Sequence, residues 1–142
     1  MLFGKRERLI RRIMIVEDEP LVAFDNEYML KDAAYEVVAT VDSFADAAQV
    51  IEAEPLDLVL TDISLAGEGD GLDVARAAAA RGIPVLIVTG NISEEAVSLA
   101  LGWLAKPYSE RILLGALAAI DDHLQGRAPK KMPEQLTLYM RA

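Results

Sequence analysis

The sequence predicts an α/β fold in which helices cover both faces of a doubly wound, five-stranded parallel sheet. Short runs of β-branched and aliphatic residues alternate with helix-like segments along the chain, and this alternation is typical of parallel sheets. The chain has 142 residues, of which 53% are hydrophobic, and it shows no internal repeat. That length and composition suit one domain with a packed core and leave too little chain for two.

Each expected element follows from its own local signals. The strands are expected at residues 13–16, 36–41, 57–61, 84–89 and 102–105. The helices are expected at residues 19–34, 43–53, 72–81, from 93 onward, and 109–124. Pro20 suits the first turn of a helix, where its missing N–H is not needed, and Ser43 suits the residue that caps one. Gly82 ends the third helix, and Pro84 opens the fourth strand region.

Charge is distributed unevenly and divides the chain into three parts. Residues 1–12 form a basic extension with five basic side chains and one acidic side chain. Residues 13–125, the expected domain, carry 5 basic and 21 acidic side chains, and residues 126–142 form a tail with 4 basic and 1 acidic. The acidic body repels nucleic acid, so no direct DNA binding is expected. The basic extension is a helical extension, a docking element or a disordered leader.

Several classes of protein and site are excluded by what the chain lacks. It contains no cysteine and one histidine, His123, which rules out disulfides, thiolate metal sites and histidine-rich sites. No run approaches the ~18 apolar residues of a membrane span, and the charged N-terminus lacks a signal-peptide core, so a cytoplasmic protein with no membrane contact is expected. The tail contains Pro129 and Pro133 and is expected to leave the domain, although residues 136–140 are apolar enough to dock.

Polar side chains follow four of the expected strands at the points where those strands end. Glu17 and Asp18 close the first run, Asp62 the third, Thr89 the fourth and Lys106 the fifth. In an open parallel sheet the carboxyl ends of the strands share one edge, and ligands bind there. Three carboxylates at one edge repel one another unless a hard cation shares them, and Mg²⁺ accepts one or two carboxylates together with phosphate oxygens. The pattern therefore predicts a site for Mg²⁺ and a phosphoryl group.

With these residues in this order, the chain from Ile13 to Leu124 resembles the receiver domain of two-component response regulators. The resemblance implies a flavodoxin-like (βα)5 fold with strand order 2-1-3-4-5. It also implies that a histidine kinase or a histidine phosphotransfer protein phosphorylates Asp62, with Mg²⁺ as cofactor. On this reading the chain is a signalling domain that assists its own phosphorylation and dephosphorylation, and it is not an enzyme.

The resemblance also implies a role for the residues around the phosphoacceptor Asp62. Asp18 would bind Mg²⁺ directly together with Asp62, Glu17 would act mainly through bound water, and the backbone carbonyl of Ser64 would complete the protein ligands. Lys106, which precedes a proline with a cis bond in the family, would stabilise the charge of the transferred phosphoryl group. Without that group, Lys106 can pair with Asp62 directly.

Three further positions match the family, and each has an ordinary structural alternative. Thr89 would turn its hydroxyl toward the phosphoryl oxygens, or it is a threonine satisfied by the backbone. Trp103 stands where the family has a switch aromatic, or it is a core residue or an anchor for a partner. Tyr108 matches the aromatic residue that usually follows the lysine and proline, and it is expected to be structural.

Two segments depart from the family pattern. The loop after Asp62 lacks the usual proline, has Ala66 in its place, and is one residue longer than the norm. The segment from Thr89 to Lys106 is short by more than a helical turn, and Gly90 replaces the usual alanine or serine, which predicts a stunted fourth helix. Such a region resembles the stand-alone or stress-pathway receivers of alphaproteobacteria.

The expected function is that of a single-domain response regulator, because no DNA-binding or enzymatic output domain fits in the tail. Its output would come through an unknown partner protein, and a homodimer is a further option. The alternative is a pseudo-receiver that binds proteins constitutively without phosphoryl turnover. A flavodoxin-like electron carrier is a third, remote hypothesis, because the acidic segment after the first strand would repel phosphate unless a metal were bound.

Overall fold

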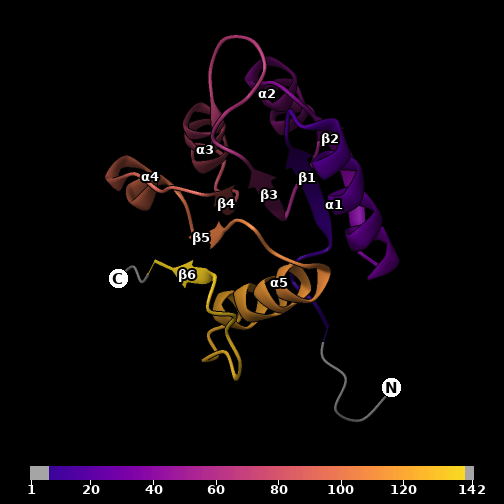
Figure 1. The fold of residues 1–142 in the computed structure, drawn as a ribbon, viewed down its shortest axis with the longest axis vertical. Coiled ribbons are helices and arrows are strands. Elements are labelled where there is room, and N and C mark those ends of the chain that lie inside the picture. The colour runs from indigo at the N-terminus through magenta and orange to yellow at the C-terminus, as the bar shows by residue number, and fades with distance from the viewer. Residues whose placement is uncertain (1–6, 140–142) are drawn as a thin grey trace.

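The computed structural model describes residues 7–139, which form one six-stranded sheet and five helices (Figure 1). The strands are β1 (Arg12–Val16), β2 (Glu36–Val41), β3 (Leu58–Thr61), β4 (Val85–Thr89), β5 (Gly102–Ala105) and β6 (Leu136–Leu138). The helices are α1 (Pro20–Asp32), α2 (Phe44–Ala53), α3 (Gly71–Ala79), α4 (Glu94–Leu99) and α5 (Glu110–Leu124). No helix within residues 7–139 is both long enough and apolar enough to cross a membrane.

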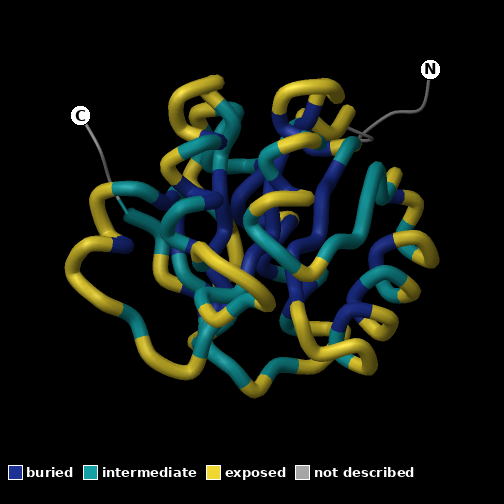
Figure 2. The backbone as a smooth tube through the Cα atoms, turned by 90° about the horizontal axis from the view of Figure 1, so that it is seen from above, coloured by how far each residue is buried: buried dark blue, intermediate teal, exposed yellow. Residues whose placement is uncertain are grey.

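The sheet has the order β2-β1-β3-β4-β5-β6, and β1 to β5 are parallel. Successive residues of a strand point to opposite faces, so each strand contributes to two separate cores. Ile13 and Ile15 of β1 pack with α1 and α5, whereas Met14 and Val16 pack with α2, α3 and α4. The buried strands consequently lie between two layers of helices (Figure 2). The doubly wound prediction and the strand order 2-1-3-4-5 are confirmed.

The five predicted parallel strands are all present, and a sixth strand that the sequence did not predict joins them, because part of the expected tail returns to the sheet. Residues 136–138 form β6, which pairs antiparallel with β5. Leu136 is 5% exposed and joins the core on the α1 and α5 side. Gly102 permits the close approach, since a Cβ atom at this position would lie 2.6 Å from the carbonyl oxygen of Thr137. A free strand edge carries unpaired N–H and C=O groups, and the apolar end of the tail satisfies those of β5.

The basic extension docks on the body from residue 7 onward, while residues 1–6 and 140–142 lie outside the described part of the chain. Ile10 is fully buried in the core beside α5. The carboxylate of Asp121 on α5 accepts hydrogen bonds from the backbone N–H groups of Leu9 and Ile10 at 3.2 and 3.0 Å. For the described residues, docking on the body is thus observed in place of a disordered leader. Burial of the Ile10 side chain stabilises this docked position.

The fourth helix is short, as the sequence predicted. α4 has 6 residues and is capped by the Ser93 hydroxyl, which accepts a hydrogen bond from the Ala96 N–H at 3.4 Å. Val97 on this helix is 41% exposed.

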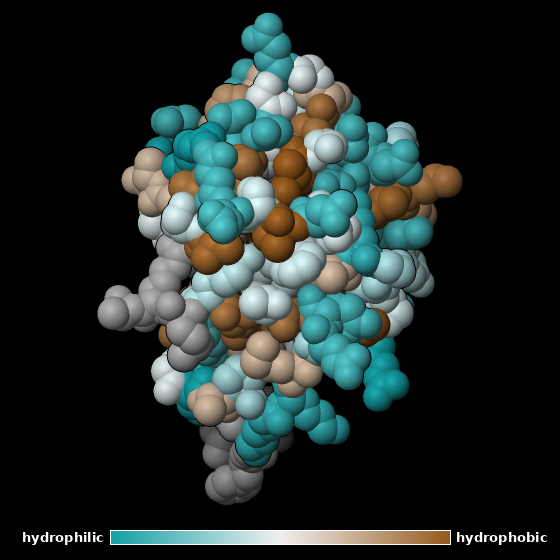
Figure 3. Space-filling model, turned by 60° about the vertical axis from the view of Figure 1, so that its left-hand side comes forward, coloured by the Kyte–Doolittle hydropathy of each residue, from teal (hydrophilic) through white to brown (hydrophobic). Residues whose placement is uncertain are grey.

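On the face shown in Figure 3, apolar side chains form small groups between hydrophilic ones.

Candidate functional site

Backbone hydrogen bonds at one edge of the sheet join the strand ends in two pairs, β1 with β3 and β4 with β5. The Asp62 N–H donates to the carbonyl oxygen of Val16 at 3.0 Å. The Lys106 N–H donates to the carbonyl oxygen of Thr89, also at 3.0 Å. The residues that follow β1, β3 and β5 therefore start from fixed and neighbouring positions, and their side chains emerge at the carboxyl edge, where ligands bind in open α/β sheets.

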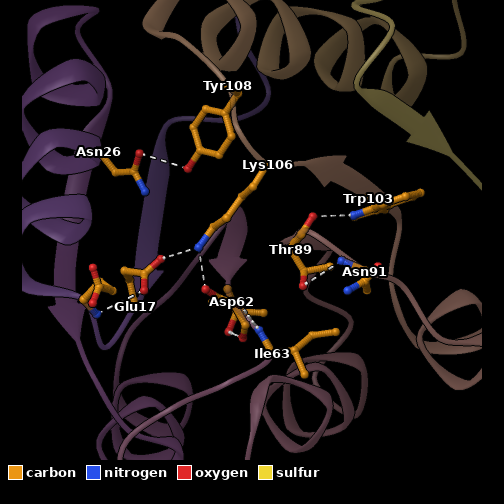
Figure 4. A network of polar contacts seen from close by, with 11 residues as sticks. Glu17, Asn26, Asp62, Ile63, Thr89, Asn91, Trp103, Lys106 and Tyr108 are labelled. Carbon is orange, nitrogen blue, oxygen red and sulfur yellow. Dashed lines mark hydrogen bonds and ion pairs between the residues drawn. The ribbon is translucent and has the colours of Figure 1, made fainter.

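Lys106 joins two carboxylates at this edge. Its Nζ lies 2.6 Å from Oδ2 of Asp62 and 3.3 Å from Oε1 of Glu17 (Figure 4). Burial by itself lowers the pKa of the lysine, but the hydrogen bonds and charges of Asp62 and Glu17 outweigh it and raise that pKa above its ordinary value. Lys106 is therefore a stable cation at neutral pH. The peptide bond between it and Pro107 is cis.

The second oxygen of each carboxylate accepts a backbone hydrogen bond. Oδ1 of Asp62 accepts from the Ile63 N–H at 2.6 Å, and Oε2 of Glu17 accepts from the Glu19 N–H at 3.1 Å. The Asp62 side chain is 14% exposed and can be reached from solvent, whereas that of Glu17 is 3% exposed. Asp62 is thus an oriented carboxylate at the surface, the arrangement that a nucleophile needs.

Glu17 bears the electrostatic cost of the site. Its burial raises the pKa of its carboxyl group, and the nearby charge of Asp62 raises it further. The hydrogen bond from Glu19 and the charge of Lys106 oppose this shift without cancelling it. A second cation beside these carboxylates would favour the charged form of Glu17.

The structure does not bring every expected residue into contact with Asp62. Asp18 and Ser64 are exposed to solvent. The Thr89 hydroxyl accepts a hydrogen bond from the Asn91 N–H at 3.4 Å, and the Thr89 carbonyl accepts one from the indole N–H of Trp103 at 3.0 Å (Figure 4). Thr89 and Trp103 therefore form a separate pair beside the cluster of Glu17, Asp62 and Lys106.

The donor set fits a hard cation in its chemistry. The site offers carboxylate oxygens and no thiolate or imidazole, and Mg²⁺ needs only one or two protein carboxylates because water and phosphate supply its other ligands. Within residues 7–139, however, no three acidic, histidine or cysteine side chains gather closely enough to hold a metal ion. Asp18 directly follows Glu17 and is exposed to solvent. Its carboxylate would therefore have to turn toward the site to serve as a third acidic ligand.

Gly71 is a residue of the site whose role the sequence did not reveal. A Cβ atom there would lie 2.0 Å from the carbonyl oxygen of Asp62. Its N–H donates to the carbonyl oxygen of Ile63 at 2.7 Å, which closes the loop after β3 onto the start of α3. The available signal was the pair Asp70-Gly71, because Asp70 caps α3 and fixes the glycine at the first helical position.

Comparison with known proteins agrees with this geometry. Residues 13–118 match the family model of the response regulator receiver domain. The chain is 31% identical over 113 residues to the transcriptional regulatory protein PdtaR of Mycobacterium tuberculosis, a match that covers 75% of this chain and 55% of that protein. This chain thus spans about half the length of that relative.

Two solved structures show the same fold. A CheY-like receiver domain protein from Methanospirillum hungatei has a TM-score of 0.72 at 27% identity, covering 82% of this chain and 98% of the other. The second structure is the receiver domain of a sensor histidine kinase from Pseudomonas aeruginosa, with a magnesium ion coordinated in its active-site cleft. It has a TM-score of 0.67 at 26% identity, covering 76% of this chain and 94% of the other. From its fold, its strand-end residues and these matches, the chain belongs to the response regulator receiver domain family of two-component systems.

Proposed function

We propose that this receiver accepts a phosphoryl group on Asp62 from a histidine kinase or a histidine phosphotransfer protein. A carboxylate oxygen of Asp62 attacks phosphorus, the bond from phosphorus to the donor's histidine nitrogen breaks, and an aspartyl phosphate forms. Water later attacks the phosphorus and releases inorganic phosphate. The observation that supports this proposal best is the contact between Lys106 and Asp62, which places a cation within 2.6 Å of the acceptor oxygen.

The residues of the site divide the work of this reaction. The Ile63 N–H holds one oxygen of Asp62, so the carboxylate keeps a fixed orientation. The ammonium of Lys106 would move its contact from the Asp62 carboxylate to the equatorial oxygens of the phosphoryl group and stabilise the negative charge there. Thr89 would turn its hydroxyl toward the same oxygens, and Trp103 would respond to that movement through the Thr89 carbonyl that it contacts.

Mg²⁺ is the cofactor that we propose for this site. It would be held by Asp18 and Asp62 directly, by Glu17 through water and by the Ser64 carbonyl. When bound, it neutralises charge on the acceptor and on the phosphoryl oxygens. The raised pKa of Glu17 supports a cation here, because a second positive charge would relieve the cost of keeping this buried carboxylate ionised.

The face of α1 beside the site suits a protein partner. Three apolar side chains of this helix, Leu21, Phe24 and Tyr28, are between 62% and 79% exposed. Neighbouring exposed apolar side chains are a property of interaction surfaces. We propose that a phosphodonor protein contacts them, and that output passes to a partner protein rather than to DNA.

The experiment is phosphorylation by a small donor. Purified protein is incubated with acetyl phosphate and Mg²⁺, and its intact mass is followed. We expect the wild type to gain one phosphoryl group and Asp62→Asn to gain none. Asp32→Asn, the same chemical change at an exposed position on α1, serves as the matched control and should label like the wild type. An unlabelled but folded wild type would instead support the pseudo-receiver alternative.

A further inference from the structure

Asn26 places a polar amide on the buried side of α1. The residue is 3% exposed, and the other buried residues of this helix are Ala23 and Leu30. A buried amide destabilises the fold unless it is hydrogen-bonded. Its Oδ1 accepts a hydrogen bond from the hydroxyl of Tyr108 at 3.1 Å (Figure 4). The amide is thus explained by a contact between helix α1 and the segment after β5.

This hydrogen bond joins the two segments that carry the charges of the site. Tyr108 lies two residues after Lys106, in the short connection between β5 and α5. Helix α1 begins directly after residues 17–19, which carry the acids. The Lys106 N–H, bound to the Thr89 carbonyl, holds the start of the connection. The contact between Tyr108 and Asn26 holds its middle and so sets the distance between the lysine backbone and α1.

Packing leaves this distance free to change, because a cavity of about 260 Å³ lies beside the pair. Val22 and Met29 of α1 border the cavity on one side, and Lys106 and Pro107 border it on the other. The connection therefore has room to move relative to α1, and a directional contact is needed to fix it. Burial raises the pKa of Tyr108, so its hydroxyl keeps its proton and remains a donor at neutral pH.

We propose that Asn26 and Tyr108 are positioning residues for Lys106, which hold its ammonium at the distance from Asp62 that phosphoryl transfer requires. The inference rests on the proposed function of Asp62 and Lys106. Neither residue touches the reacting atoms. Their effect comes from geometry, because a displacement of about 1 Å at a catalytic group can cost up to ~100-fold in rate.

The first test removes either end of the hydrogen bond. Tyr108→Phe deletes the donor, and Asn26→Leu deletes the acceptor at similar volume. The phosphorylation rate is measured with acetyl phosphate at saturating Mg²⁺, by intact mass. We expect each variant to lose about tenfold in rate. The matched control is Tyr35→Phe, the same chemical change at a position directly before β2, at the opposite end of the sheet from Lys106, which should keep the wild-type rate.

A second test asks whether the effect passes through Lys106. Tyr108→Phe is combined with Lys106→Ala, and the rate is compared with that of Lys106→Ala alone. Because the hydroxyl acts by positioning the ammonium, it should have no further effect once the ammonium is gone. The same fold loss in both backgrounds would show that Tyr108 acts by another route and would overturn the inference.

A third test separates positioning from stability. Replacing one partner leaves a buried polar group unsatisfied, whereas replacing both with apolar groups of similar shape can be nearly neutral. The double variant Asn26→Leu/Tyr108→Phe should therefore recover much of the melting temperature and keep the low rate. A rate that recovers with the melting temperature would contradict the proposal.

The outcomes also separate this inference from the function on which it rests. Absence of labelling in the wild type would refute phosphorylation of Asp62 and with it the basis of the inference. Normal labelling of the wild type, combined with a wild-type rate in Tyr108→Phe, would refute only the positioning role.

Discussion

At the scale of single residues, the negative charge of the resting site is partly balanced by its own lysine. Lys106 lies within 3.3 Å of both Glu17 and Asp62, so a cation is already in place before any ligand arrives. Asp18, in contrast, is exposed and is hydrated by solvent. The carboxylate that is costly to keep charged is therefore Glu17, because it is the buried one and its pKa is raised by burial.

This difference predicts the effect of removing each charge in buffer without divalent metal. Glu17→Gln should raise the melting temperature at pH 7 by roughly 2 to 4 °C, equivalent to about 1 kcal/mol. The folded-state pKa of Glu17 is raised, so its ionised form destabilises the fold above that pKa and the cost disappears as the pH falls through it. The gain from the substitution should shrink at acid pH. Thermal unfolding from pH 7 to pH 4 measures this, and a lower melting temperature at pH 7 would contradict it.

Asp18→Asn is the matched control, because it removes a carboxylate at the next position in the chain but in solvent. We expect its melting temperature without metal to stay within 1 °C or so of the wild type, in line with ordinary surface substitutions. Mg²⁺ titration of the same variants then separates stability from metal binding. Both should bind Mg²⁺ more weakly than the wild type if the proposed ligand set is correct.

At the scale of elements, long apolar runs were predicted well and short or polar features were not. Strand alternation, the short α4 and the strand-end positions of Asp62 and Lys106 follow from local patterns that any buried parallel sheet imposes. β6 has 3 residues and pairs with a distant strand, so its pattern alone is too short to recognise. Asn26 was missed because a polar residue on a helix suggests the solvent face, whereas its partner Tyr108 is far along the chain.

The sixth strand yields a prediction about Gly102. Gly102→Ala should loosen β6 and lower stability by about 1 to 3 kcal/mol, as overpacking does, because the added methyl group collides with the Thr137 carbonyl. The amides of Ala105 and Tyr139, which donate to Gln135 and Leu101 across this pairing, should then exchange with deuterium faster. Gly90→Ala is the matched control, since nothing lies within 4 Å of a Cβ atom there. Unchanged exchange in Gly102→Ala would show that β5 and β6 adjust without separating.

At the scale of the whole molecule, the two ends of the sheet have different tasks. The carboxyl edge carries the charged cluster, and the opposite end is closed by the segment before β1. There Asp121, which is 7% exposed, accepts two backbone hydrogen bonds from that segment, and Ile10 fills the core below it. The guanidinium of Arg8 also lies 4.0 Å from the centre of the Tyr35 ring. The segment thus contributes to the fold at a distance from the chemistry.

A chain that starts at Ile13 should therefore be less stable and yet keep its chemistry. Loss of Ile10 removes about 2 to 3 kcal/mol of apolar burial, and Asp121 loses its two backbone donors. Urea unfolding should show a loss of at least roughly 3 kcal/mol. Ile10→Ala should reproduce most of it, whereas Leu9→Ala, at a position that is 51% exposed, should not. At a temperature where the shortened chain is folded, an altered rate of Asp62 phosphorylation would indicate coupling between the two ends.

The antiparallel sixth strand also has a consequence for biosynthesis. A growing chain leaves the ribosome from its N-terminus, and β6 is translated after every other described element. The nascent protein therefore completes β1 to β5 while the outer edge of β5 is still open. During that interval the edge can pair with strands of neighbouring nascent chains, and only the arrival of residues 136–138 closes it. A pause in translation before Leu136 would lengthen this period and keep the edge of β5 exposed to such pairing for longer.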